Sequence, residues 1–278
     1  MSLSLKEVDD GLALLYLLGS PDLEVLGVTT TFGKGHIDQV YSQTTWLDDR
    51  LHLAIPILKG ESGHHLGERT PAAEFLVEMV RSNPGEITIL ATGSVSNLHA
   101  AAKLDPEFFY LVKRITVMGG YLSPLKLGYR NLKELNFSAN PKASLALLTA
   151  VCPVTVFSAQ ACLDAPYRLR NIQQADYWSG WIKRMLIQWL ITFGLYTGEM
   201  VFYHWDLLPA VYLNAPHLFN VIPIQIGSTL ADMQKGMLRN ESSGTGPIIS
   251  LATEIKDQKG FYQQLDIIWQ NAMLKYIL

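Results

Sequence analysis

Residues 8–33 read VDDGLALLYLLGSPDLEVLGVTTTFG and set the pattern of the chain. An apolar helical segment at 11–19 is followed by a β-branched run at 23–32, which is typical of a buried parallel strand. The same alternation continues downstream. Further strands are expected at 54–60, 87–93, 114–120 and 154–160, and helices at 37–46, 70–82, 97–102 and 141–150. This order predicts an α/β fold with a mostly parallel sheet and helices on both faces.

Length and composition favour one compact domain. The chain has 278 residues, so we predict a single domain over residues 1–278. Hydrophobic residues make up 49% of the chain, charged residues make up 17%, and the formal net charge is -3. No basic stripe is present for a phosphate backbone and no polybasic cluster for an anionic membrane surface. Nucleic acid is therefore excluded as an expected partner.

The cysteines and the apolar runs bear on the compartment. Cys152 and Cys162 are too few, and too far apart, for a disulfide framework or a CxxC metal site, which favours a reducing cytoplasm. The apolar run at 11–18 follows acidic residues and has no cleavage pattern after it, so no export signal is expected. The run at 185–203 approaches the length of a membrane span, but Glu199 and two glycines favour a buried helix pair. No membrane partner is expected.

The ligand edge of the predicted sheet collects small and polar residues. In an open parallel sheet, ligands bind outside the carboxyl ends of the strands. Thr30 and Gly33 follow the first of these strands, Thr92 follows the third, and Met118 with Gly119 ends the fourth. The glycines allow the backbone to approach a ligand closely. The binding site is expected at this edge.

Two acidic features precede apolar helices. Asp9 and Asp10 stand before the helical segment at 11–19, and Asp206 stands before another apolar segment far downstream. One interpretation is that these carboxylates only cap helices, because Asp is a favoured N-cap residue. The other is that carboxylates from distant segments meet at the ligand edge and bind a hard cation or sugar hydroxyls.

Two further segments carry polar side chains of the right kind. Glu134 and Asn136 lie in the segment ELNFSANP, which is otherwise an ordinary turn sequence. His204 and Trp205 come directly before Asp206, among aromatic residues that fit a core as well as a wall for a base.

Four segments resemble, in the same order, the inosine-uridine-preferring nucleoside hydrolase family. Residues 8–33 resemble its opening DD, helix and strand, and residues 83–106 its central TGxLTNLA segment. RITVMGG at 114–120, together with ELNFSANP at 134–141, resembles its MGG, EFN and DP motifs. WDLLPAVYLNAP at 205–216 resembles its closing carboxylate motif. The resemblance covers nearly the whole chain, and the joint order of the motifs is specific.

The resemblance implies a fold, an activity and a cofactor. The fold is α/β, with a Rossmann-like open, mostly parallel sheet flanked by helices. The activity is hydrolysis of the N-glycosidic bond of ribonucleosides to ribose and free base through an oxocarbenium-like transition state. The cofactor is Ca²⁺, the partner is a nucleoside, and the chain is expected to form a homo-oligomer, either a dimer or a tetramer.

Site residues follow from the same resemblance. It implies that Asp10, the carbonyl of Thr92 and Asp206 are calcium ligands. Asp9, Glu134 and Asn136 would bind ribose, with Glu134 at its 5′ side. The remaining implied roles are leaving-group protonation by His204 and substrate contacts from Lys34, Met118 and Trp205. Asp9 and His204 are thus the predicted catalytic residues.

This sequence departs from the family pattern at several positions. The family opens with a strand ending in DxD, whose last Asp is a calcium ligand and general base, and the segment MSLSLKEVDD at 1–10 does not supply it. Lys34 stands where Asn is usual, Asn140 where Asp is usual, and Trp205 where many relatives have His. We expect a misassigned start codon, a truncated relic or loss of catalysis to explain the opening. The alternatives to a hydrolase are a non-catalytic nucleoside- or ribose-binding protein and a structural α/β domain.

Overall fold

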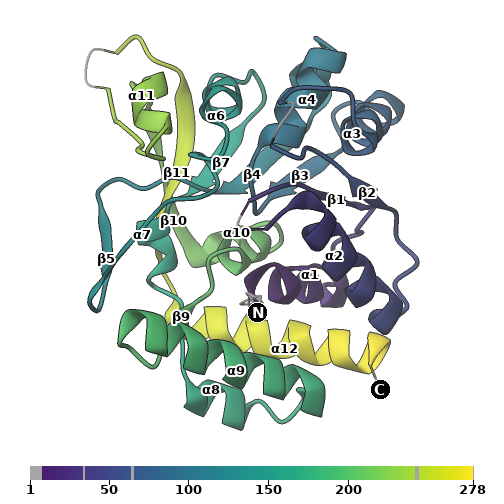
Figure 1. Ribbon diagram of the computed structural model, residues 1–278, viewed down its shortest axis with the longest axis vertical. Coiled ribbons are helices and arrows are strands. Elements are labelled where there is room, and N and C mark those ends of the chain that lie inside the picture. The colour runs from purple at the N-terminus through teal and green to yellow at the C-terminus, as the bar shows by residue number, and fades with distance from the viewer. Residues whose placement is uncertain (1–7, 34, 64–65, 242–243, 278) are drawn as a thin grey trace.

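The computed structural model describes residues 8–33, 35–63, 66–241 and 244–277 (Figure 1). The helices are α1 (Asp9–Gly19), α2 (Ile37–Leu51), α3 (Pro71–Ser82), α4 (Ser96–Leu104), α5 (Phe108–Leu111), α6 (Pro141–Leu148), α7 (Ala159–Cys162), α8 (Leu169–Gln174), α9 (Gly180–Thr197), α10 (Leu207–Tyr212), α11 (Leu230–Met233), α12 (Gln258–Tyr276) and the 3₁₀ turn η1 (Pro216–Leu218). The strands are β1 (Val28–Thr30), β2 (Ile57–Lys59), β3 (Thr88–Ala91), β4 (Arg114–Met118), β5 (Leu125–Leu127), β6 (Arg130–Leu132), β7 (Val154–Phe157), β8 (Pro166–Tyr167), β9 (Phe202–Tyr203), β10 (Phe219–Gln225) and β11 (Ile248–Ile255).

The main sheet has five strands in the order β10-β11-β7-β4-β3. Strands β3, β4, β7 and β11 run parallel, and β10 pairs antiparallel with β11 at one edge. The predicted mostly parallel α/β sheet is confirmed. Strands β1 and β2 form a separate parallel pair, and within the described residues no ladder joins that pair to β3. The sheet is therefore divided between β1 and β3.

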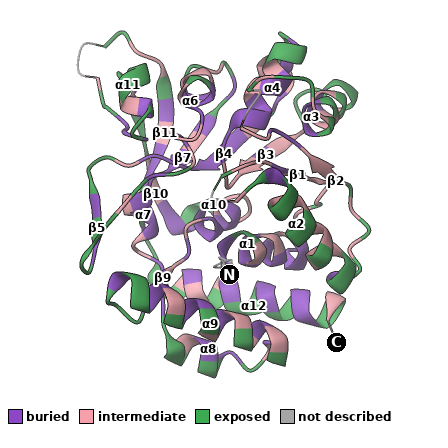
Figure 2. Ribbon diagram, viewed as in Figure 1, coloured by how far each residue is buried: buried purple, intermediate pink, exposed green. Residues whose placement is uncertain are grey.

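Alternating side chains of the main sheet feed two separate clusters of buried residues. On β4, Ile115 and Val117 enter one cluster with helices α3, α4 and α6, whereas Met118 enters the other with α1, α10 and α12. On β7, Val156 and Phe157 divide in the same way. Burial on both faces explains why these strands are continuous apolar runs in the sequence. Figure 2 shows the buried residues concentrated on the central strands and on the helix sides that face them.

The apolar segment at 185–203 holds most of one helix, α9, and then the short strand β9, so the predicted helix pair is wrong. Helix α9 runs to Thr197 through Gly194 and ends where Gly198 adopts a left-handed φ of 89°. A lone glycine costs a helix about 1 kcal/mol, which packing of one apolar face can offset. Among the described residues, no helix combines the length and the apolar character needed to cross a membrane.

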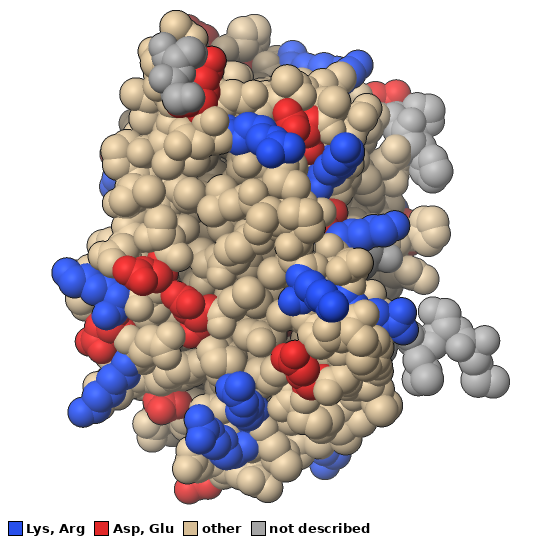
Figure 3. All heavy atoms as spheres, turned by 90° about the vertical axis from the view of Figure 1, so that its left-hand side faces the viewer, with Lys and Arg blue, Asp and Glu red and all other residues tan. Residues whose placement is uncertain are grey.

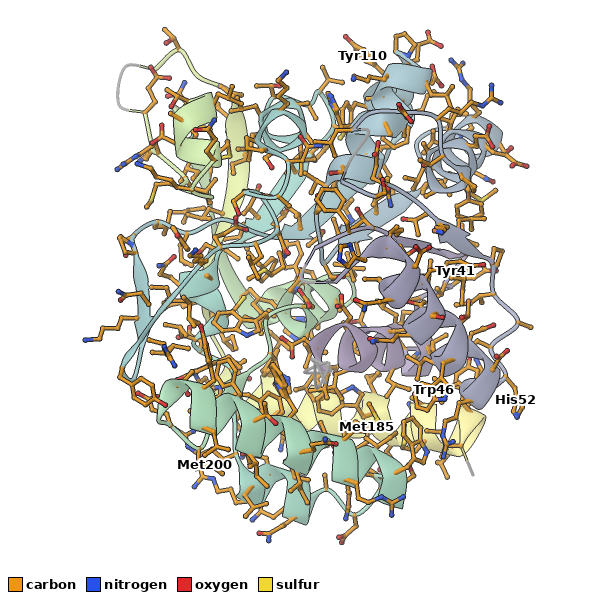
Figure 4. All side chains as sticks on the ribbon, in the orientation of Figure 1. Tyr41, Trp46, His52, Tyr110, Met185 and Met200 are labelled. Atoms are coloured by element: carbon orange, nitrogen blue, oxygen red, sulfur yellow. The ribbon has the colours of Figure 1, made fainter. Side chains whose placement is uncertain are left out.

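Helices α2 and α9 are joined at the surface by an aromatic and cationic stack. The rings of Trp46 and Trp181 meet edge to face at 6.0 Å between centroids. The guanidinium of Arg50 lies 5.6 Å from the first ring centre and 4.8 Å from the second. Figure 4 shows Trp46 on α2 in the region where that helix approaches α9. This contact holds α2 against α9.

Charges on the exposed surface are mixed. On the face shown in Figure 3, Lys and Arg side chains are interspersed with Asp and Glu and do not gather into one basic stripe.

Helices α1 and α12 cross so closely that Gly19 has no room for a side chain. A Cβ at Gly19 would lie 2.1 Å from the carbonyl oxygen of Ile268 and 2.9 Å from the Cβ of Ala272. In the same helix, a Cβ at Gly11 would meet its nearest neighbour, Leu47, at 3.9 Å. Gly19→Ala should therefore lower the free energy of unfolding by roughly 1–3 kcal/mol, because backbone atoms of α12 would have to move.

Gly11→Ala is the matched control, since both substitutions gain the helix propensity of alanine but only one creates a clash. Urea unfolding monitored by circular dichroism should give a lower midpoint for Gly19→Ala and an equal or higher midpoint for Gly11→Ala. Equal midpoints for the two variants would contradict the close crossing.

Candidate functional site

The carboxyl ends of β3 and β4 are held together by the side chain of Asn136. Its Nδ2 donates to the carbonyl oxygen of Thr92 at 3.0 Å and to that of Met118 at 2.9 Å. The Thr92 hydroxyl then donates to Oδ1 of Asp10 at 2.6 Å. These three bonds connect two strand ends to the start of α1. The predicted residues Asp10, Thr92, Met118 and Asn136 therefore come together at the ligand edge.

The amide of Asn136 leaves one group available for a ligand. Its two N–H donors are used by the two carbonyl oxygens, so the remaining capacity is that of the acceptor Oδ1. Asn136 is partly buried, so the rest of its side chain is held by the protein while this oxygen can meet a hydroxyl group.

Glu134 organises the loop that presents Asn136. Its Oε1 accepts from the backbone N–H groups of Gly120 at 3.1 Å, Asn136 at 2.8 Å and Phe137 at 2.8 Å. Its Oε2 accepts from the N–H of Ser138 at 2.8 Å. A carboxylate buried to 7% exposure and holding four backbone donors is a positioning group for the loop. Glu134 was predicted to bind ribose. Its carboxylate would have to accept ribose hydroxyl groups in addition to the four N–H groups of the loop.

Asp9 at the start of α1 and Asp206 at the start of α10 are both buried, and these two helices pack together. Asp9 is 3% exposed and Asp206 is 7% exposed, and α1 packs against α10. Both acids influence Cys162: burial first, then the negative charges of Asp206 and Asp9, raise the pKa of its thiol well above the usual value. The Cys162 Sγ donates to the carbonyl oxygen of Trp205 at 3.3 Å. Cys162 thus marks the region where the two acidic segments converge.

The acidic residues do not act as simple caps. The N-cap of α1 is Val8, which has no polar side chain, and Asp9 and Asp10 lie inside the first turn. Asp206 occupies the N-cap of α10 but makes no capping hydrogen bond to it. The interpretation of these carboxylates as helix caps is wrong. Asn140, by contrast, does cap α6, because its Oδ1 accepts from the N–H of Ala143 at 3.2 Å.

His204 lies in the core, so the prediction that it is a catalytic acid is corrected. The residue is fully buried, and its ring lies 4.6 Å from Tyr167, 5.5 Å from Phe202 and 5.6 Å from Trp269 between centroids. Within the described part of the chain, neither ring nitrogen has a hydrogen-bond partner. Burial lowers the pKa of His204 to about 3, so the ring is neutral at pH 7, and neither buried ring nitrogen is exposed to a ligand.

Two other predicted residues have different positions. Trp205 is half-buried, and its ring lies 5.7 Å from that of Tyr203. It follows His204 in the chain and stands directly before Asp206, so it borders the acidic segment. Lys34 lies outside the described residues.

Sequence reasoning missed two residues that shape this edge. One is Cys162, described above, and the other is Asn97 at the start of α4. The Asn97 side chain donates to the carbonyl of Thr30 at 3.0 Å and accepts from the N–H of Glu61 at 3.0 Å. It therefore ties the ends of β1 and β2 to the helix that follows β3. The available signal was its place four residues after the strand-end Gly93, at the ligand edge.

The oxygen atoms at this edge are the type of ligand that calcium prefers, but they are fewer than calcium needs. Asp10, Asp206 and the Thr92 carbonyl supply oxygen atoms, which calcium prefers, and the carbonyl keeps a second lone pair beside the Asn136 bond. Calcium takes about 6–8 oxygen ligands. Among the residues that the structure describes, no group of three or more His, Cys, Asp or Glu side chains is arranged to hold a metal. Water and substrate hydroxyls would have to complete the set.

Comparison with known proteins identifies a matching family and relatives that are similar in sequence or in fold. Residues 6–263 match the family model described as inosine-uridine preferring nucleoside hydrolase. Uridine nucleosidase 1 of Arabidopsis thaliana is 31% identical over 178 residues, covering 54% of this chain and 52% of that protein. The inosine-uridine preferring nucleoside hydrolase of Crithidia fasciculata is 24% identical, covering 61% of this chain and 63% of that protein. The alignments thus span between about half and two thirds of the length of these curated relatives.

A solved structure supports the fold assignment. The purine-preferring ribonucleoside hydrolase from Gardnerella vaginalis superimposes with a TM-score of 0.83, at 21% identity and 96% coverage of both chains. At this identity the likeness establishes the shared α/β fold.

The buried His204 predicts an acid-sensitive core. Its pKa is about 3 in the folded chain and about 6.5 when unfolded, so the unfolded state binds the proton first as the pH falls. Between pH 7 and pH 4.5 this difference should remove roughly 2–3 kcal/mol of stability. His204→Leu should lose that part of the pH dependence while keeping the cavity filled.

The exposed His217→Leu serves as the control and should keep the wild-type pH dependence. The measurement is the free energy of unfolding in urea at pH 7 and pH 4.5. If His204→Leu and wild type lose the same free energy over this range, His204 is not the buried neutral group described here.

Proposed function

The chain belongs to the inosine-uridine preferring nucleoside hydrolase family, and from that premise we propose that it hydrolyses the N-glycosidic bond of ribonucleosides to ribose and free base. The observation that supports this proposal most is the hydrogen-bonded connection Met118–Asn136–Thr92–Asp10 at the carboxyl edge of the sheet. It presents polar groups from three segments to one place. A ribose ring with its hydroxyl groups is a ligand that such groups suit.

Ribose binding is assigned to the acceptors at this edge. Asn136 offers its Oδ1, and the carboxylates of Asp9 and Asp10 stand at the start of α1. Hydroxyl groups are donors that carboxylate and amide oxygens accept well. Glu134 acts on the sugar through Asn136, whose backbone it holds, as a positioning residue.

The surrounding negative charge favours the reaction. As the bond from C1′ to the base breaks, its electron pair leaves with the base and positive charge develops on the ribose ring. Carboxylates fixed nearby stabilise that charge more in the transition state than in the ground state. The water oxygen then bonds to C1′, and one of its protons goes to a carboxylate while the base gains a proton from solvent. Asp9 and Asp206 are buried and Asp10 is exposed, so Asp10 is the carboxylate that water can reach.

Calcium is proposed as the cofactor, held by Asp10, Asp206 and the Thr92 carbonyl. When bound, such an ion would orient sugar hydroxyls and lower the pKa of a bound water. The proposal rests on the oxygen donors of these residues and on the family premise. Association of copies into a dimer or tetramer and a cytoplasmic setting are further proposals. For the setting, both cysteines are buried free thiols.

Substitutions at the edge test the proposed activity. Asn136→Ala removes the group that joins the strand ends and offers Oδ1, so kcat/KM for uridine or inosine hydrolysis should fall by about 100-fold or more. Asn131→Ala, an exposed asparagine on β6, is the control and should leave kcat/KM unchanged. The measurement is release of reducing sugar with time.

Each other outcome selects a different function. Binding of a ribonucleoside without any release of sugar would favour the non-catalytic binding protein. Neither binding nor release would favour a structural domain, and equal activity in Asn136→Ala and wild type would place the reaction elsewhere.

Calcium binding is tested separately by thermal unfolding. A ligand that binds only the folded state raises Tm, by an amount that grows with its concentration over its Kd. Millimolar calcium should raise the Tm of the wild type, and Asp10→Ala and Asp206→Ala should each lose most of that rise. The exposed Asp176→Ala should retain it. The same rise in all four proteins would show that calcium binds elsewhere or without specificity.

A further inference from the structure

A pocket lies between α8 and α12, lined by none of the residues of the candidate site. It has a volume of about 210 Å³. Its walls come from α8, from the segment that follows it, and from one face of α12. Pockets for drug-sized ligands are usually about 300–1,000 Å³, so this one suits a ligand of one ring system and not a whole nucleoside.

Four of the ten residues that line the pocket are aromatic. Tyr167 and Trp269 are 3% and 0% exposed, so they support the pocket from within the core and offer almost no ring surface to a ligand. The partly buried Tyr177 and Tyr262 complete the aromatic lining. Their hydroxyls are anchored, because Tyr177 donates to Oδ1 of Asp266 at 2.7 Å and Tyr262 donates to the carbonyl of Pro166 at 2.6 Å. Rings held in this way are preorganised to stack on a flat ligand.

Side-chain amides supply hydrogen bonds at the rim. Gln174 and Gln270 line the pocket and are exposed, so their amides are accessible to a ligand. Asn171 also lines it, and its Oδ1 accepts from the N–H of Arg168 at 2.9 Å, which leaves its NH₂ group as a donor. An amide carries an acceptor and two donors side by side, which matches a ring edge that carries C=O and N–H together.

The charge around the pocket favours a neutral ligand. Asp266 contributes a negative charge to its wall, while the positive charges of Arg168 and Arg170 act on Tyr262. Neither sign dominates, so an organic cation or anion has no clear advantage. We infer that this pocket binds a small, neutral, planar heterocycle with adjacent donors and acceptors, the chemical class of a free nucleobase. The inference does not depend on the proposed hydrolysis.

Binding of uracil and of adenine to full-length protein tests this inference by isothermal titration calorimetry. The protein carries Asn136→Ala, which disables the candidate site at the sheet edge. We expect one equivalent of base to bind per chain. Adding Gln174→Ala and Gln270→Ala should weaken that binding by about tenfold or more, because two hydrogen-bonding amides are lost.

Gln173→Ala with Gln263→Ala is the matched control, since both are exposed glutamines on the same two helices but outside the pocket lining. That pair should leave the affinity unchanged. The inference is overturned if neither base binds in the Asn136→Ala protein, or if the two glutamine pairs have the same effect. It is also overturned if ribose binds at Gln174 and Gln270 while the bases do not, which would make the pocket a sugar site.

Discussion

The hydrogen bonds of one amide, that of Asn136, hold the functional edge of this protein in place. Parallel strands end in backbone carbonyl groups that the ladder no longer pairs, and such groups need partners when they are partly buried. Asn136 satisfies one from β3 and one from β4, and it can do so because Glu134 fixes its backbone. The Thr92 hydroxyl then positions Asp10. Without these hydrogen bonds, no side chain described here would connect the end of β3, the end of β4 and the start of α1.

The acidic character of the edge depends on the packing beneath it. Helices α1 and α12 cross at Gly19, the last residue of α1, with no room for a methyl group, so the far end of that helix is held against α12. At the other end of α1, Asp9 is buried, as is Asp206, and burial first and then their negative charges raise the pKa of the Cys162 thiol. Buried carboxylates are costly, so their retention at the end of a sheet where ligands bind supports a role in ligand binding. The same core encloses His204, which the family pattern places near the chemistry but which the fold surrounds with aromatic rings.

Much of the fold could be predicted from the pattern of apolar residues alone. Strands β3, β4 and β7 appear in the sequence as continuous apolar runs, which are typical of strands buried on both faces of a sheet. The ligand edge followed from the general rule for open parallel sheets, so Thr92 and Met118 could be grouped before the structure, whereas the role of Asn136 was implied by the family resemblance. Side-chain orientation could not be predicted. Nothing in the sequence indicates that Glu134 turns both oxygens toward the backbone, that His204 points inward while Trp205 borders the acidic segment, or that α9 continues through Gly194. These outcomes depend on tertiary packing, which overrides local preference.

The central claim is that the edge organised by Asn136 supports hydrolysis of a ribonucleoside. The most direct test is product analysis after incubation of the chain with uridine and inosine in ¹⁸O-labelled water, with inorganic phosphate present. The account predicts free base together with ribose that carries the label at C1′, and no ribose 1-phosphate. Intact nucleoside after prolonged incubation at saturating concentration would contradict it, and so would a sugar phosphate as the main product.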